Sequence, residues 1–134
     1  MSQLVSVLLV GAGGAVGSMA RYLTQVYVER SPLAGTWPWA TLLVNAVGSL
    51  LLGALLGAVG PAPEGAALRW KLALGTGVMG GFTTYSTYNA EVLGFFSRGE
   101  SWLGAAYLMT TVVTCLAFGT AGLLLGRALG GAPG

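Results

Sequence analysis

Four long apolar runs constrain the fold of this chain more than any other feature. They cover residues 4–27, 39–59, 72–96 and 102–125. Each run is long enough to cross the hydrocarbon core of a bilayer as a helix, which takes about 20 residues. The second and fourth runs carry no charge, whereas the first carries only Arg21 and the third only Glu91. None alternates between polar and apolar residues as a barrel strand does, so an all-α integral membrane protein with four transmembrane helices is predicted.

The scarcity of charge supports this class and excludes others. Only 7% of the 134 residues are charged, against about 25% in soluble domains. The chain has no His, and its four acids are scattered glutamates, so we expect no enzyme. The lone Cys115 excludes an internal disulfide, and a net charge of +2 is too small for a nucleic-acid patch. A cleaved signal peptide is disfavoured for the first run, which lacks a basic segment before it.

The six basic residues divide evenly between the two membrane sides. Four helices joined by short loops put both termini on one side, as one domain over residues 1–134. The basic residues are Arg69, Lys71 and Arg127 on that side and Arg21, Arg30 and Arg98 on the other. The positive-inside rule then favours neither orientation. One alternative is that Arg21 is embedded in the membrane and does not count, so that the remaining charges set one orientation. The other is that the chain inserts in both orientations and opposite copies assemble.

Three pairs of glycines spaced four residues apart predict close helix contacts. The pairs are Gly13 with Gly17, Gly53 with Gly57, and Gly77 with Gly81. Such contacts can join helices within one chain or helices of two copies. A bundle of four helices has little room for a wet path inside it, which favours a transport route between subunits.

Polar groups at membrane depth are costly and face protein or water, so they mark candidate sites. In the second run, Thr41, Asn45 and Ser49 share one helix face. Asn45 either makes an interhelical hydrogen bond or lines a site. In the fourth run, Tyr107, Thr111 and Cys115 form a similar stripe. These hydroxyls either line a pore or bond back to helix carbonyls.

The third run is the most unusual, because adjacent glycines precede a dense polar segment between residues 77 and 91. Glycines and threonines form helix poorly, so the third helix is predicted to break in mid-membrane. Broken backbone survives there only inside protein or beside a cavity, and its freed carbonyls suit a small cation. Tyr85 and Tyr88 share a face and offer ring edges and hydroxyls. Neutral donors with few fixed charges favour a small anion as ligand.

Three of these segments resemble the CrcB/Fluc family of prokaryotic fluoride channels. They are residues 13–22, 41–49 and 77–91, and length, helix count and motif order also match over nearly the whole chain. The resemblance implies an antiparallel dual-topology homodimer in the bilayer of the prokaryotic plasma membrane. It implies two pores at the subunit interface that passively export cytoplasmic fluoride. It also implies a structural sodium ion (Na+) on the two-fold axis, held by the backbone carbonyls of Gly80 and Thr83.

The family's pore residues carry over onto this sequence with two departures. The fluoride pore is assigned to Asn45, Thr41, Arg21, Tyr85, Tyr88, Ser86, Thr87, Tyr107 and Thr111. The two tyrosines replace phenylalanines whose ring edges face fluoride in the family pattern, and Cys115 replaces a serine. A heterodimer with a phenylalanine-bearing partner is therefore an alternative to the homodimer.

Two other functions compete with the channel. A small proton-coupled exporter with four spans is one alternative, but its expected carboxylate in the first run is missing. A non-conducting subunit of a heteromeric channel is the other, and the altered pore positions would suit it.

Overall fold

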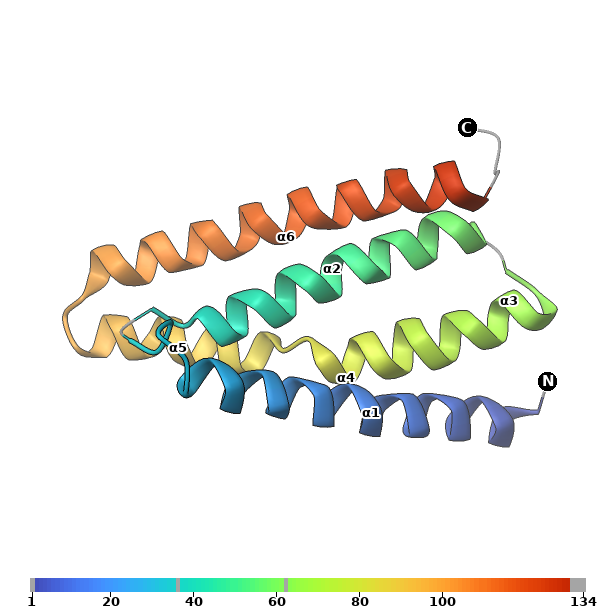
Figure 1. Ribbon diagram of the computed structural model, residues 1–134, viewed down its shortest axis with the longest axis horizontal. Helices are drawn as coiled ribbons and strands as arrows, with labels where there is room; N and C mark the ends of the chain where they lie inside the picture. The colour runs from blue at the N-terminus through green and yellow to red at the C-terminus, as the bar shows by residue number, and fades with distance from the viewer. Residues whose placement is uncertain (1, 36, 62, 131–134) are drawn as a thin grey trace.

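The computed structural model describes residues 2–35, 37–61 and 63–130 and shows an up-and-down bundle of four helical rods (Figure 1). The first rod is α1 (Gln3–Glu29), the second is α2 (Trp39–Val59) and the last is α6 (Ser101–Gly130). All three are long and apolar enough to cross a membrane. The start of α1 and the end of α6 lie at the same end of the bundle. The predicted all-α class is confirmed for the part of the chain that the structure describes.

The third rod is built from several pieces. It consists of α3 (Gly65–Trp70), the π-helix η1 (Lys71–Met79), α4 (Gly80–Phe82) and α5 (Tyr85–Ser97). Between α4 and α5, Thr83 and Thr84 are extended, with φ and ψ of −77° and 158° and of −149° and 114°. Thr83 and Thr84 are both β-branched, which favours this conformation over helix. The third apolar run, 72–96, is therefore shared among η1, α4 and α5.

Glycines let the rods approach each other at backbone distance. A Cβ on Gly17 of α1 would lie 2.8 Å from the Phe82 nitrogen, and one on Gly77 would lie 2.9 Å from the Gly13 Cα. Between α2 and α6, a Cβ on Gly57 would lie 2.8 Å from the Arg127 nitrogen. The sequence left open whether the glycine pairs join helices of one chain or of two copies. The structure shows that they make contacts within one chain.

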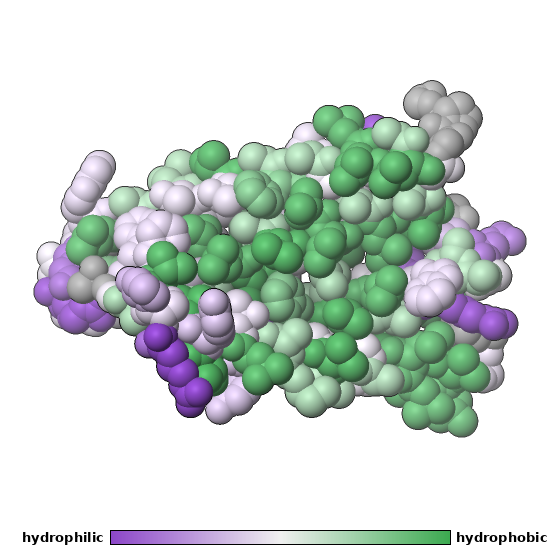
Figure 2. Space-filling model, in the orientation of Figure 1, coloured by the Kyte–Doolittle hydropathy of each residue, from purple (hydrophilic) through white to green (hydrophobic). Residues whose placement is uncertain are grey.

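The bundle buries only a small apolar core, near the end where α5 meets α6. This core consists of Leu42, Tyr88, Val92, Phe95 and Tyr107. Large apolar side chains are instead exposed along the rods, as Figure 2 shows by the green surface over the middle and the purple groups toward the two ends. A surface of this kind suits contact with lipid or with another apolar protein surface.

Candidate functional site

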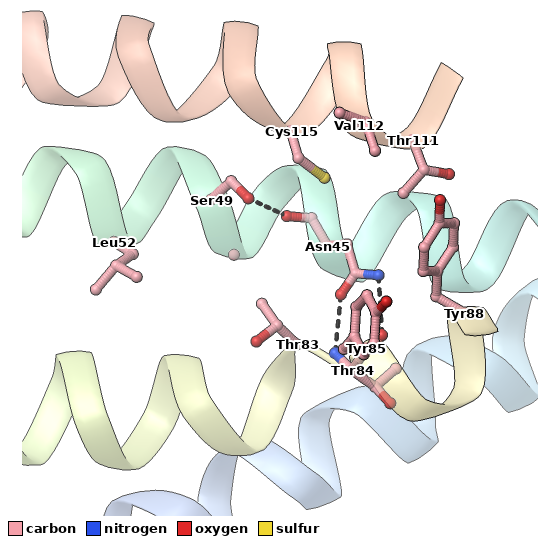
Figure 3. A pocket seen from close by; sticks show the side chains of 11 residues that line it. Asn45, Ser49, Leu52, Thr83, Thr84, Tyr85, Tyr88, Thr111, Val112 and Cys115 are labelled. Atoms are coloured by element: carbon pink, nitrogen blue, oxygen red, sulfur yellow. Dashed lines mark hydrogen bonds between the residues drawn. The ribbon is translucent and has the colours of Figure 1, made fainter. Parts of the chain in front are cut away.

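Asn45 holds the interrupted part of the third rod against α2. Its Nδ2 donates to the Thr84 carbonyl at 3.1 Å, and its Oδ1 accepts from the Thr84 backbone N–H at 2.8 Å (Figure 3). An unpaired backbone group at membrane depth costs several kcal/mol. One buried amide thus bonds to both backbone groups of Thr84, the residue that precedes α5. This is the interhelical hydrogen bond that the sequence left as one of two alternatives.

Hydroxyl groups complete the ends of the two helical pieces. The Thr84 Oγ1 accepts from the Thr87 N–H at 3.2 Å and so caps α5, and it donates to the Thr87 Oγ1 at 3.0 Å. On the other side of the break, the Thr83 Oγ1 donates to the Met79 carbonyl at 2.9 Å. The Thr84 hydroxyl replaces a helical acceptor for the Thr87 N–H, whereas the Thr83 hydroxyl adds a second bond to the Met79 carbonyl, which still accepts from the Thr83 N–H at 3.0 Å.

The same bonds leave two carbonyl groups without their helical donors. In a continuous helix the Thr84 N–H would bond to the Gly80 carbonyl and the Thr87 N–H to the Thr83 carbonyl. Here the first N–H donates to Asn45 and the second to the Thr84 hydroxyl. Each of these carbonyls has thus lost the donor that a continuous helix would give it, and they belong to Gly80 and Thr83, the two residues predicted from the sequence to hold sodium.

A pocket of about 310 Å³ lies beside the break (Figure 3). It is lined from α2, from the break with the start of α5, and from α6. Its lining residues are Asn45, Gly48, Ser49, Leu52, Thr83, Thr84, Tyr85, Tyr88, Thr111, Val112 and Cys115, and all of them are uncharged. Within the described residues, the Thr111 Oγ1 is buried and has no hydrogen-bond partner, which is uncommon for a buried hydroxyl.

The two tyrosines of the pocket have different surroundings. The Tyr88 side chain is buried, and its hydroxyl donates to the Leu108 carbonyl of α6 at 3.1 Å. Tyr85 is 78% exposed, and its ring centroid lies 5.9 Å from that of Tyr88. The Tyr88 hydroxyl is thus fixed to the bundle, while the Tyr85 ring stands at the rim of the pocket on the outer surface.

The Glu91 carboxylate, which does not line the pocket, accepts hydrogen bonds from two of the predicted pore residues. The Thr41 Oγ1 donates to one carboxylate oxygen and the Tyr107 hydroxyl to the other, each at 2.7 Å. Tyr107 is fully buried, and its ring packs on Tyr88 with 5.4 Å between centroids. Glu91 was not among the site residues predicted from the sequence. It could have been predicted, because Glu91 is the one acid in the four apolar runs. A carboxylate at membrane depth requires hydrogen-bond donors around it.

The remaining predicted site residues lie outside the set that lines the pocket. The Ser86 Oγ lies 3.3 Å from the Thr84 Oγ1 on the exposed side of α5. Thr87 serves the cap of α5, as described above. Arg21 is half-buried on α1, which contributes no residue to the pocket. The structure thus brings Asn45, Tyr85, Tyr88 and Thr111 together, with Thr41 and Tyr107 at Glu91.

Comparison with known proteins identifies the family. Residues 8–123 match the family described as CrcB-like protein, Camphor Resistance (CrcB). The fluoride-specific ion channel FluC of Agrobacterium fabrum is 43% identical over 127 residues, which cover 94% of this chain and 99% of that protein. FluC of Anaeromyxobacter dehalogenans is 44% identical over 128 residues, covering 96% and 100%. FluC of Erythrobacter litoralis is 37% identical over 127 residues, covering 92% and 93%. Because the family match spans most of its length, this chain belongs to the CrcB-like protein family.

Proposed function

We propose that this chain forms a fluoride-selective channel that exports cytoplasmic fluoride passively. The observation that carries the proposal is the pocket at the break, whose wall is uncharged and includes the Asn45 amide and several hydroxyl-bearing residues. The Asn45 amide retains a second N–H beyond the one bonded to Thr84, and the exposed Tyr85 adds a hydroxyl. Such donors can replace the water around a small anion without holding it as a fixed charge would. The names of the FluC relatives support fluoride as that anion.

The proposed channel is an antiparallel homodimer in the prokaryotic plasma membrane, with one pore at each copy of the pocket. The exposure of Tyr85 supports this arrangement, because a second copy would enclose the rim that one chain leaves open. The even division of the basic residues supports insertion in both orientations. The exposed apolar surface of the rods supports both lipid contact and a broad subunit interface.

The carbonyl groups of Gly80 and Thr83 fit a structural sodium ion between the two copies. Both carbonyls have lost their helical donors to Asn45 and Thr84. A Cβ placed on Gly80 would meet nothing within 4 Å, so the backbone there is open to a partner. A bound sodium ion would supply positive charge that neutralises the converging carbonyl dipoles. The chain's own contribution is the fixed extended geometry of Thr83 and Thr84.

Fluoride efflux from liposomes that contain only this purified chain tests the proposed function. We expect rapid fluoride efflux and no chloride efflux, because the pocket walls offer closely spaced donors to a small anion. Empty liposomes are the control, and a fluoride electrode gives the readout. Dimers that pass no fluoride would instead support a non-conducting subunit. Proton uptake that depends on a substrate would support the proton-coupled exporter.

Removal of sodium should destabilise the dimer. An ion that binds only the folded state adds about 2.7 kcal/mol when its concentration is 100 times its Kd. We therefore expect the melting temperature in detergent to fall when sodium is replaced by N-methylglucamine, and to recover as sodium is added back. Lithium and potassium at equal ionic strength are the controls. A melting temperature that does not respond to sodium would contradict the proposed ion site.

A further inference from the structure

Two hollows open beside Glu91 at the end of the bundle where α5 meets α6. The smaller, of about 280 Å³, includes Trp37 and Thr41 in its wall. The larger, of about 580 Å³, includes Thr87, Arg98 and Glu100. Glu91 belongs to both walls, together with Gly35 and Pro38 of the preceding loop. These hollows are where the polar groups around Glu91 reach the surface.

Contacts between side chains connect the hollows to the pocket at the break. Tyr88 lines that pocket and packs on the Tyr107 ring, whose hydroxyl donates to Glu91. An anion that passed from the pocket toward this end would have to pass the buried Tyr107 ring and then the Glu91 carboxylate. A carboxylate repels an anion, so entry or exit at this end calls for a positive charge nearby.

Arg98 supplies that charge at the outer edge of the larger hollow. Its guanidinium lies 5.0 Å from the centroid of the Phe95 ring. Its Nη2 and Nε lie 2.9 and 3.0 Å from the same Glu100 oxygen, Oε2. The backbone fixes this pair, because Gly99 has a φ of 77° and the Glu100 N–H donates to the Phe95 carbonyl at 2.9 Å. Within the described residues, Arg98 is the one basic side chain in the wall of either hollow, where it stands against the three acids Glu29, Glu91 and Glu100.

We propose that Arg98 attracts the anion to this mouth of the ion path. Glu100, which is paired with Arg98, offsets part of the positive potential that the anion meets. The inference rests on the proposed fluoride channel. The side chains of Arg98 and Glu100 are 56% and 40% exposed, so both charges act in water and are screened by salt. The screening length is about 10 Å at 0.1 M ionic strength. Arg98 therefore acts on the rate of anion entry at low ionic strength.

Single-channel current at low fluoride and low ionic strength provides the test. We expect Arg98→Gln to lower the current roughly threefold and Glu100→Gln to raise it roughly twofold, as single screened charges would. Both differences should vanish when potassium gluconate is added. The matched control is Arg30→Gln, which removes the same charge from the same end of the bundle but lies outside both walls.

The expected changes in current have opposite signs for Arg98→Gln and Glu100→Gln. Damage to the fold would instead lower the current in both variants. A loss of current in both variants would overturn the inference, as would an Arg30→Gln effect equal to that of Arg98→Gln. An effect of Arg98→Gln that persists at high salt would also overturn it. If the unmodified chain passes no fluoride, the proposed function fails instead, and it does so before any variant is compared.

Discussion

Asn45→Asp is expected to abolish fluoride flux while the chain still assembles. The substituted carboxylate keeps the bond from the Thr84 N–H but faces the Thr84 carbonyl oxygen at the position where Nδ2 now donates at 3.1 Å. In the pocket it adds a fixed negative charge beside the anion. At an effective dielectric constant of 20, two like charges about 4 Å apart repel by about 4 kcal/mol. That energy corresponds to a loss of flux of roughly three orders of magnitude.

The same substitution should lower stability to a smaller degree. The Thr84 carbonyl loses its hydrogen bond from Asn45 but keeps its place at the start of α5, so the loss costs about 0.5–1.5 kcal/mol. The matched control is Asn89→Asp, because Asn89 is the other asparagine of the chain and lies exposed on α5. Liposome efflux and elution of the dimer on gel filtration measure the two effects. Wild-type flux in Asn45→Asp would contradict a role for Asn45 in an anion path.

The sequence predicted the helical class and the membrane-spanning character well, because both follow from long uncharged runs. It could not predict the form of the third rod in detail. The glycines and threonines indicated where helix is weak, but the residue types of Lys71–Met79 did not indicate a π-helix, in which Gly75 and Gly77 are buried against neighbouring rods. The positions of helix ends also moved, since α6 continues to Gly130, beyond the last apolar residue of its run.

The sequence predicted several residues of the candidate site but not the hydrogen bonds that they make with other rods. Helical spacing placed Thr41 and Asn45 on one face, yet their partners lie far along the chain. Thr41 bonds to Glu91 and Asn45 to Thr84, at separations of 50 and 39 residues. Periodicity within one helix carries no information about which residue of another rod lies opposite. For the same reason, the sequence left open whether the glycine pairs make contacts within or between chains.

Gly122→Ala is expected to disrupt the contact between α2 and α6, whereas Gly119→Ala three residues earlier should be tolerated. A Cβ on Gly122 would overlap the Leu50 carbonyl oxygen and lie 2.9 Å from the Ala54 nitrogen. Both atoms belong to the backbone of α2, so relief requires the helices to separate. A Cβ on Gly119 would instead lie 3.7 Å from the Ser49 carbonyl oxygen, an ordinary contact.

The two variants should differ in how they change the free energy of unfolding. Alanine gains about 1 kcal/mol over glycine in a helix interior, and overpacking a tight contact costs about 3 kcal/mol. Gly122→Ala should therefore lose about 2 kcal/mol, while Gly119→Ala should be neutral or slightly stabilising. Thermal melting in detergent, followed by circular dichroism, measures both. Equal melting temperatures for the two variants would mean that α2 and α6 do not approach at backbone distance. In that case Asn45 on α2 and Thr111 on α6 would no longer be held on facing walls of one pocket.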